Sequence, residues 1–507
     1  MTVFSFFIVS LLLFLQLFIS FCDGGKLLLS VMDQGRSHAT SFTPLMHRLQ
    51  KDNHTTALQF AIFQEDIDFG MEERFINMSD FDNPFFSPNF ARLAFDEEYN
   101  FIDQAKGMGC GSVTCGRILE HRRKEFFKLA DEDWDFILTD SLFSACGYGL
   151  AKVTNKPHIM MHSTALESGL GTFKSYGANH ALVVPNLLPY AFPNFNVSYF
   201  HHRALSAYDW MGQILFTVFF GDIAQKYALR SIIPFPWFSY YDYNRESVFS
   251  FTDMPEQLYQ PFPRTNDYFA YGAYCKSISA DLPTNIKNFI EDPKSKGTII
   301  IAFGTFIDWR TAPRKKYEIF RNVVNKLSDY RVIWSMRGDR PEGLGEHVLT
   351  AAWIPQNALL LHNKTKLFVS HGGLKSVKET VCSATPTVFM PMFAEQMRNA
   401  WLVKEKGFGK IINKFYYTER SLETNVREIL KNPYYQKSAS KFKSIYLDQP
   451  IANLDEAAFK FKKLFDYNGK LPNYFYSRGL QLSYFTTLNL DLLFVIPMFL
   501  VYIVFKK

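Results

Sequence analysis

Short apolar runs recur along the chain, separated by longer segments that mix polar and apolar residues. Such runs, ended by Gly, Asp or a polar loop, are typical of buried strands in a parallel α/β sheet. The predicted strands are Lys26–Val31, Thr56–Ile62, Asp135–Asp140, Pro157–Met161, Gly297–Phe303, Arg331–Met336 and Leu367–Ser370. A stretch rich in Pro and turn residues, Asp253–Pro283, predicts a linker. Two α/β domains are therefore expected, with Phe75–Gly107 as loop and Gly169–Tyr243 as helices and loops.

A possible catalytic pair stands at the ends of two predicted strands of the first domain. His38 follows the first strand and its Gly-containing loop, and a helix with Pro44 in its first turn is expected next. Asp140 ends a later strand, so both side chains reach the carboxyl edge of the sheet, where ligands bind in open α/β sheets. Singly, His38 fits a structural or solvated residue and Asp140 fits a helix N-cap. Their joint occurrence favours a site.

A second candidate site follows the strand Leu367–Ser370. His371-Gly372-Gly373 comes next, and then a predicted helix, Leu374–Cys382. A strand that leads through a Gly turn into a helix presents free backbone N–H groups and the positive end of the helix dipole, which together bind phosphate. Glycine lets the backbone approach an anion closely, and His371 adds a side-chain donor.

Polar and aromatic residues at fixed distances from this turn strengthen the nucleotide interpretation. Trp353 offers a flat apolar face for a base, and Gln356 an amide for a base or ribose edge. Ser376 and Glu379 are three apart on the predicted helix and share one face. Glu379 can therefore accept two hydrogen bonds from a ribose diol.

The segment from Trp353 to Gln396 resembles the nucleotide-sugar signature of the UDP-glycosyltransferase (UDP-glucuronosyltransferase) family. The matching elements are Trp-x-Pro-Gln, His-Gly-Gly, Ser-x-x-Glu and an acid-Gln pair. The resemblance implies that Trp353 stacks on uracil, that the His371 turn holds the diphosphate, and that Glu379 binds ribose. It assigns these residues to the UDP-sugar site: Thr305, Trp353, Gln356, His371, Gly372, Gly373, Ser376, Glu379, Glu395 and Gln396.

The same resemblance implies a fold and a reaction. The fold is GT-B, two Rossmann-like domains facing one another across a cleft, with residues 23–270 binding the acceptor and 271–455 the UDP-sugar. His38 acts as general base and Asp140 as its partner. The reaction is inverting transfer of a hexosyl or glucuronosyl group to a small lipophilic acceptor. UDP-sugar is a co-substrate, and neither a metal nor another cofactor is expected.

Two residues depart from the family pattern. Lys375 stands where the family usually has Asn, and Glu395 where it usually has Asp. Lys375 and Glu379 are four apart, so they can pair and compete with ribose binding; a cation there can equally help to hold a diphosphate. The longer Glu395 side chain shifts a sugar contact. An alternative function is therefore kept: a non-catalytic GT-B protein that binds a nucleotide sugar or a lipophilic ligand.

Both ends of the chain are apolar. Residues 1–22 are expected to be a secretory signal, although the missing basic n-region leaves an uncleaved anchor open. Residues 484–505 are expected to span a membrane once, after a return helix and juxtamembrane segment at 456–483, although Leu490–Phe505 alone is short for a span. The basic pair at 506–507 suits a cytosolic tail. The expected location is the endoplasmic reticulum membrane, with the body in the lumen.

Composition adds limits rather than a site. The 47% hydrophobic and 21% charged content is that of a globular protein. The net charge of +6 is spread without a basic block, so no nucleic-acid partner is expected. Beyond Cys22, five cysteines form no disulfide framework, although Cys110 with Cys115 can bridge locally. The sequence leaves open whether the protein forms a homo-oligomer. Glycosylation is suggested by sequons at Asn53, Asn77, Asn196 and Asn363.

Overall fold

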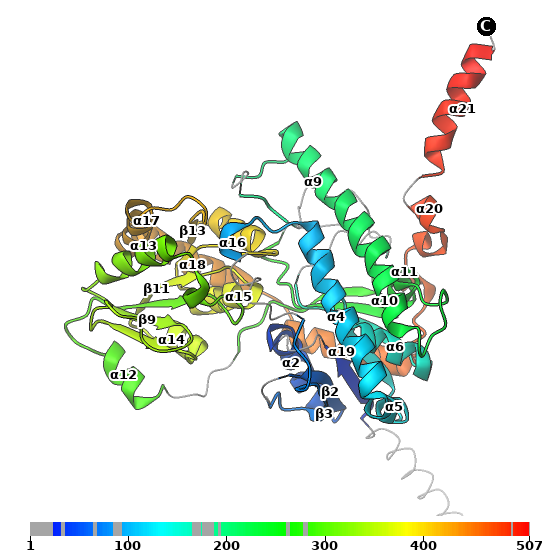
Figure 1. The fold of residues 1–507 in the computed structure, drawn as a ribbon, viewed down its shortest axis with the longest axis horizontal. Coiled ribbons are helices and arrows are strands. Elements are labelled where there is room, and N and C mark those ends of the chain that lie inside the picture. Colours follow the sequence, from blue (N-terminus) through cyan, green and yellow to red (C-terminus); the bar gives the residue numbers. More distant parts are fainter. Residues whose placement is uncertain are drawn as a thin grey trace, which may run out of the picture.

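Two parallel sheets, each covered by helices, make up the body of the protein (Figure 1). The computed structural model describes residues 24–31, 36–63, 68–84, 94–164, 174, 187–190, 194–259, 264–276, 282–487 and 490–505. The expected signal at 1–22 and the tail at 506–507 lie outside the described residues.

The N-terminal sheet has seven parallel strands in the order β3-β2-β1-β4-β5-β6-β7. They are β1 Lys26–Ser30, β2 Thr55–Ile62, β3 Glu72–Asn77, β4 Phe136–Asp140, β5 His158–His162, β6 Phe249–Thr252 and β7 Tyr268–Ala270. In β1, Leu29 pairs with Leu58 of β2 on one side and with Leu138 of β4 on the other. Strand order reverses between β1 and β4, so the loops after these two strands diverge and leave room for a ligand between them.

The C-terminal sheet has six parallel strands in the order β10-β9-β8-β11-β12-β13. They are β8 Thr298–Ala302, β9 Arg331–Ser335, β10 Val348–Ala351, β11 Thr365–Ser370, β12 Thr387–Phe389 and β13 Gly409–Ile411. Its reversal lies between β8 and β11, where Ala302 pairs with Ser370. The two turns that leave this point begin at Gly304 and His371, so the second sheet also carries its candidate site at its switch point.

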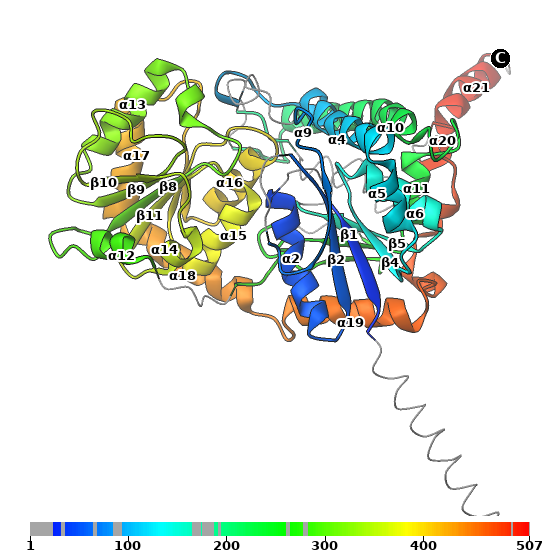
Figure 2. The same ribbon diagram turned by 60° about the horizontal axis from the view of Figure 1, so that its bottom comes forward.

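Helices cover both faces of each sheet (Figure 2). In the N-terminal domain, α2 (Arg36–Gln50) and α19 (Asn453–Asp466) build one face of the core, and α4 (Phe101–His121), α5 (Arg123–Ala130) and α6 (Ala145–Thr154) build the other. The C-terminal domain carries α12 Thr284–Ile290, α13 Arg314–Asn325, α14 Gln356–Leu361, α15 Leu374–Ser383, α16 Gln396–Glu405, α17 Glu419–Lys431 and α18 Pro433–Leu447.

The chain end returns to the first domain through α19. Its Phe461 stacks on Phe251 of β6 with ring centroids 4.6 Å apart, and its Asp455 accepts a hydrogen bond from Arg48 of α2 at 2.5 Å. Phe461 is fully buried, so this contact is part of the N-terminal core. The N-terminal domain is therefore built from both ends of the sequence.

Three expectations about local structure are corrected. The segment expected to be a loop, Phe75–Gly107, begins with the end of β3 and closes with the first two turns of α4, which starts at Phe101. The alternating pattern of β3 is weak because only Ile76 among its residues is buried. Helix α2 begins at Arg36, so His38 lies in its first turn and Pro44 inside its body. The linker expected from Asp253 holds β7, an edge strand three residues long, before the chain crosses to the second domain.

The disulfides also differ from the expected pairing. Cys115 of α4 is bonded to Cys146 of α6, and Cys275 is bonded to Cys382 of α15. Cys110 belongs to neither bridge. Cys110 and Cys115 lie on one continuous helix, and side chains five positions apart on a helix point in different directions, so the two cannot bond to each other. The second bridge joins the segment that leaves β7 to the helix after the Gly turn, and so connects the two domains.

A buried ion pair lies beside this bridge. Lys378 of α15 donates to Asp253, the residue after β6, at 2.5 Å, and their side chains are 7% and 1% exposed. The Lys378 ammonium also lies 3.8 Å from the ring centroid of Tyr274, whose hydroxyl donates to Asp253 at 3.1 Å. Burial raises the pKa of Asp253, and Lys378 partly offsets this. The pair fixes α15 against the N-terminal domain.

The C-terminal end forms two further helices, α20 Tyr484–Thr487 and α21 Leu492–Phe505, and α21 contains Pro497. Among the described residues, no helix combines the length and apolar character needed to cross a bilayer.

Removing the cation of the buried pair should cost far more stability than removing an exposed one. Lys378→Met leaves the Asp253 carboxylate buried without its partner, so we expect the free energy of unfolding to fall by about 3–5 kcal/mol. Lys326→Ala, which removes a half-exposed lysine from its pairs with Glu419 and Glu423, should cost much less, because solvent screens these exposed pairs. Urea unfolding of the two variants checks this. Equal losses would contradict it, and Lys378→Met/Asp253→Leu should recover most of the loss.

Candidate active site

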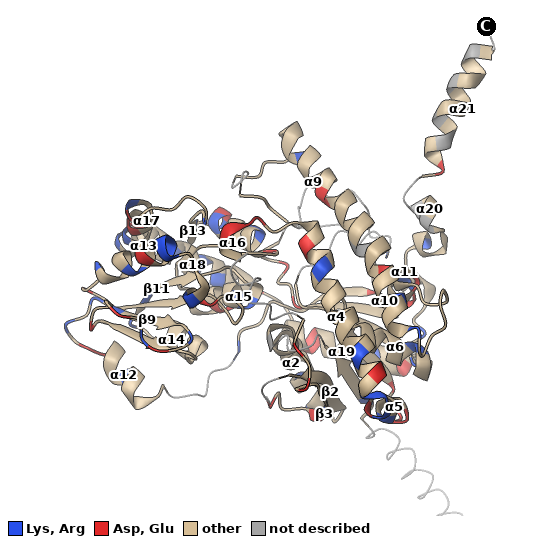
Figure 3. Cartoon of the chain, viewed as in Figure 1, with Lys and Arg blue, Asp and Glu red and all other residues tan. Residues whose placement is uncertain are grey.

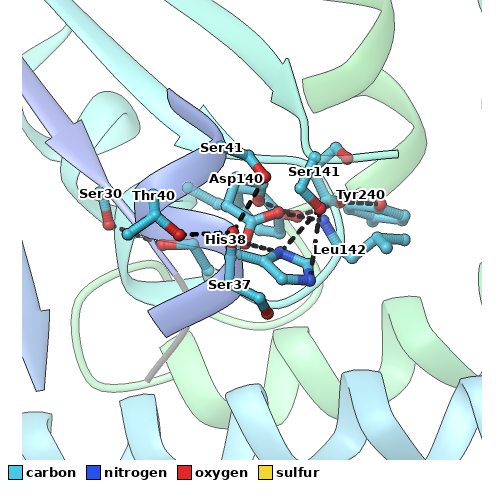
Figure 4. A network of polar contacts seen from close by, with 12 residues as sticks. Ser30, Ser37, His38, Thr40, Ser41, Asp140, Ser141, Leu142 and Tyr240 are labelled. Carbon is cyan, nitrogen blue, oxygen red and sulfur yellow. Dashed lines mark hydrogen bonds and ion pairs between the residues drawn. The ribbon is translucent and has the colours of Figure 1, made fainter. Parts of the chain in front are cut away.

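His38 and Asp140 meet at the switch point of the N-terminal sheet (Figure 4). His38 Nδ1 lies 2.7 Å from Asp140 Oδ2. The other carboxylate oxygen accepts from the backbone N–H of Leu142 at 3.3 Å, which sets the plane of the carboxylate. Asp140 is fully buried and does not cap α6, whose N-cap residue is Ser144. With Nδ1 turned to Asp140, Nε2 is the nitrogen left to face a substrate.

The environment of His38 favours its protonated form. Burial lowers the pKa of His38, but the charge of Asp140 and its hydrogen bond outweigh burial and hold the pKa above 6.5. Glu395 raises this pKa further and Lys375 lowers it. Both of these residues belong to the C-terminal domain, so the two domains act electrostatically on one imidazole.

Two more side chains of the N-terminal domain surround the imidazole. Ser163, the residue after β5, places Oγ 3.0 Å from Nδ1 and 3.3 Å from Nε2 of His38. The ring of Phe143 meets the imidazole edge to face with centroids 5.3 Å apart. The loop after β4 thus places an apolar side chain beside the imidazole, and the loop after β5 places a polar one.

The Gly turn of the C-terminal domain has the backbone geometry that an anion site needs. Gly372 has φ +88°, and a Cβ there would lie 2.9 Å from the carbonyl oxygen of Gln396. Gly373 is the N-cap of α15, whose first N–H groups have no acceptor within the helix. Gly304, with φ +73°, brings the turn after β8 against the ring of His371. Only glycine fits at Gly372 without strain.

His371 lies between these turns as a neutral side chain. Burial lowers its pKa to about 4, and a backbone contact with Ala302 offsets this only in part. At neutral pH the imidazole is therefore uncharged, and its single N–H group is engaged with the backbone of Ala302. Thr305, which follows Gly304, is exposed and caps no helix, because Asp308 caps the short helix Trp309–Thr311.

The residues assigned to the nucleoside lie on neighbouring elements. Gln356, the first residue of α14, donates to Glu379 of α15 at 2.5 Å and to Ser376 at 3.5 Å. Burial raises the pKa of Glu379, and Lys375 and Gln356 offset part of that rise. Trp353 precedes α14 and is 72% exposed, so its ring face is available for stacking. Hydrogen bonds thus bring Gln356 of α14 together with Ser376 and Glu379 of α15, and Trp353 lies three positions before Gln356.

The acid-Gln pair begins α16. Gln396 is buried, and its Oε1 accepts from the N–H groups of Met392 (2.9 Å) and Phe393 (3.2 Å), which shapes the preceding loop. Glu395 accepts from Asn399 at 3.4 Å. Asn399 also donates to the carbonyl of Gly372, at 3.1 Å, and accepts from Tyr259 at 2.5 Å. Asn399 thus links the acid-Gln pair to the Gly turn, a role that sequence motifs do not reveal.

Lys375 crosses from one domain to the other. It lies in the first turn of α15, and its ammonium donates to Thr40 Oγ1 of α2, two residues beyond His38. Glu379, the partner expected for Lys375, instead accepts a hydrogen bond from Gln356. Burial, together with the nearby charge of Lys276, lowers the pKa of Lys375 to about 8. Thr40 was not predicted; its only sequence signal is its nearness to His38.

The ten residues assigned to the UDP-sugar site thus lie in the loops after β8, β10, β11 and β12 and on α14, α15 and α16. Lys375 joins α15 to the helix that carries His38. Among the described residues, no group of three or more His, Cys, Asp or Glu side chains is arranged to hold a metal ion.

Comparison with known proteins identifies the relatives of this arrangement. The family model described as UDP-glucoronosyl and UDP-glucosyl transferase matches residues 26–506. The UDP-glucuronosyltransferase of Pleuronectes platessa is 34% identical over 184 residues, 36% of this chain and 38% of that protein. UDP-glucuronosyltransferase 2A3 of Pongo abelii is 30% identical over 237 residues, 47% of this chain and 43% of that protein. These two matches span about two fifths of the relatives' length. UDP-glucuronosyltransferase 1-2 of Mus musculus is 25% identical over 449 residues, 85% of this chain and 78% of that protein.

Solved structures share the fold at low sequence identity. The glycotransferase of kitacinnamycin superposes with a TM-score of 0.56 at 16% identity, covering 87% of this chain and 99% of that one. The spinosyn forosaminyltransferase gives a TM-score of 0.56 at 14% identity over the same shares of the two chains. Two parallel-sheet domains in this arrangement form the GT-B fold of glycosyltransferases. By that fold and by a family match over nearly its whole length, the protein belongs to the UDP-glucoronosyl and UDP-glucosyl transferase family.

Proposed function

We propose that the protein transfers a hexosyl or glucuronosyl group from a UDP-sugar to a small lipophilic acceptor, with inversion at the anomeric carbon and His38 as general base. One observation carries the proposal. The His38–Asp140 pair stands beside the N-terminus of α15, because Lys375 of α15 is hydrogen-bonded to Thr40 in the helix of His38. A base and an anion site are thus close enough to serve one reaction.

The proposed chemistry uses the two ends of this arrangement separately. His38 Nε2 takes the proton of the acceptor O–H, and the acceptor oxygen forms its bond to the anomeric carbon. The bond from that carbon to the β-phosphate oxygen breaks on the opposite face, which inverts the configuration. Asp140 stabilises the imidazolium that forms and holds its Nδ1–H.

The leaving UDP carries the negative charge to the C-terminal domain. The N–H groups at the start of α15 can hydrogen-bond to its phosphates, and the uncharged ring of His371 lies beside the same turn. Lys375 adds a cation at the same helix end. Trp353 stacks on the base and Glu379 accepts from the ribose hydroxyls, while Glu395 and Gln396 face the sugar. These fixed dipoles and charges need little reorganisation during the reaction.

The function is tested by UDP release from the purified protein across a panel of UDP-sugars, with a pool of phenolic and lipid alcohols. We expect acceptor-dependent release with at least one donor. His38→Gln should lower this release about 10²- to 10⁴-fold, because the general base is lost. UDP binding by the variant, measured by calorimetry, should be unchanged. Full turnover by His38→Gln would exclude His38 as the base.

Asp140→Asn should change the pH profile as well as the rate. The base works only when His38 is neutral, so activity falls as pH drops through its raised pKa. Asparagine removes the charge that raises this pKa and leaves the burial that lowers it. We expect kcat to fall about 10²- to 10⁴-fold and the acidic limb of the kcat profile to move to lower pH. An acidic limb that stays in place would contradict the assignment of this limb to His38.

A non-catalytic GT-B binder is the second candidate, and one contact favours it. The ammonium of Lys375 already donates a hydrogen bond to Thr40, and the family pattern has Asn, not Lys, at position 375. Binding of UDP without release from any donor would support this function. In that case Lys375→Asn and Glu395→Asp, singly and together, should restore turnover if the two departures are the cause.

We also propose that residues 484–505 anchor the protein once in the endoplasmic reticulum membrane, with the body in the lumen. Helix α21 is apolar along all of its 14 residues, and two disulfides suit an oxidising compartment. Asn53, Asn77, Asn196 and Asn363 are all exposed, as glycan acceptors must be. Protease protection of the body in sealed microsomes tests this topology, and digestion from outside would overturn it.

A further inference from the structure

A row of large apolar side chains is exposed along one long helical segment of the N-terminal domain. This segment joins α9 (Phe200–Gln213), the π-helix η1 (Ile214–Phe220) and α10 (Gly221–Leu229). The residues of the row, called the apolar stripe below, are between 47% and 64% exposed. They are Tyr208, Met211, Leu215, Phe219, Phe220, Ile223 and Tyr227. Steps of three and four residues dominate, so they lie on one face.

Core packing explains little of the stripe. Tyr208 meets the ring of Phe101 edge to face with centroids 5.5 Å apart, but the closest approaches to the core come from other positions of the same helices. A Cβ at Gly212 would lie 2.5 Å from the ring of Phe101 in α4, and Gly221 lies against Met108 of the same helix. Leu229 is fully buried against Gly149 of α6. These close approaches fix the rotation of the helical segment and leave the stripe facing outward.

The stripe carries little charge. Between residues 208 and 227 the sequence has three charged residues, Asp209, Asp222 and Lys226. Asp222 and Lys226 form an ion pair at 2.6 Å with both side chains less than one fifth exposed. Asp209 accepts from Gln213 at 2.8 Å, and burial raises its pKa to about 7. Figure 3 shows long uncharged stretches along α10 and the end of α9 that meets it.

Aromatic and basic residues stand at the α10 end of the stripe. The guanidinium of Arg230 lies 3.7 Å from the ring centroid of Tyr227. In the loop that follows, Phe235 is 65% and Trp237 is 80% exposed. Tyr and Trp favour the boundary between lipid and water, and Arg can extend from it into the headgroups.

The apolar C-terminal helix leaves the molecule from the same side. Arg245 of α11 (Tyr240–Glu246) donates to the carbonyl oxygen of Leu482, which places the start of α20 beside the helix that follows α10. Figures 1 and 2 both show α20 and α21 extending from the α10 end of this side of the N-terminal domain. The stripe and α21 can therefore meet one surface together.

We propose that the apolar stripe lies in the headgroup–acyl boundary of a phospholipid bilayer, as a second membrane contact besides the C-terminal helix. A continuous, uncharged face about 29 Å long, with aromatic ends and one arginine, matches an interfacial amphipathic helix. A bilayer is favoured over a second copy of the chain because the stripe runs alongside the exit of an apolar helix. The N-terminal domain then rests on the membrane, and lipophilic acceptors dissolved there are close to it.

The test uses the full chain in phospholipid nanodiscs, in a Cys22→Ser/Cys110→Ser background. A nitrobenzoxadiazole label is attached at Phe219→Cys on the stripe or, as a control, at Tyr416→Cys, which is 83% exposed on the C-terminal domain. Doxyl-labelled lipids should quench the Phe219→Cys label at least about fivefold more than the control, and aqueous iodide should quench it less. Equal access of iodide to both labels would overturn the proposal. Shielding without lipid quenching, dependent on protein concentration, would indicate a second copy and would also overturn it.

A second variant separates membrane contact from folding. Leu215→Glu/Phe219→Glu places two charges on the stripe without touching the His38 pair or the Gly turn. A label at Ile223→Cys should lose its lipid quenching in this background, while the circular dichroism spectrum stays unchanged. Phe459→Glu, on an exposed residue of α19, should leave that quenching intact. Lipid quenching that survives the two glutamates in the folded variant would contradict the proposed contact.

Discussion

Helix α15 is the element on which the arrangement of both domains depends. Its first turn, after Gly373, is the candidate anion site. Its middle carries Lys378 in the buried pair with Asp253, and Cys382 near its end is bonded to Cys275. A charge buried so deeply is stable only while its partner stays in place. The constraint that joins the two domains is thus the same one that aims the start of α15 at α2.

Two partly buried histidines at this boundary have pKa values shifted in opposite directions. Burial lowers the pKa of both, but His38 also has the carboxylate of Asp140 at 2.7 Å and its pKa ends above 6.5. His371 has only a backbone partner, and its pKa falls to about 4. One imidazole is therefore suited to exchange a proton near neutral pH, and the other stays uncharged there. In a proposed transfer reaction, this difference divides proton removal from support of the leaving group.

Much of the fold and part of the site follow from local sequence. The runs Leu27–Leu29 and Ile299–Ile301 are buried on both sides, so their apolar character alone predicts central parallel strands. The Gly turn after β11 was predictable because its backbone geometry restricts residue type. β3 was missed because a half-exposed edge strand lacks such an apolar run. The start of α2 was predicted too late, because Pro44 was assigned to the first turn of a helix that begins at Arg36.

The sequence by itself determined the two α/β domains and the residues that line their switch points, because burial and tight turns leave signals within a few neighbouring positions. Only the tertiary structure decided which distant groups meet. Cys115 pairs with Cys146, and Lys375 reaches Thr40 of the other domain. The rotation of α9 and α10, set by packing against α4, turned a helical apolar face outward. Such contacts depend on how elements pack in three dimensions, and no local pattern encodes that.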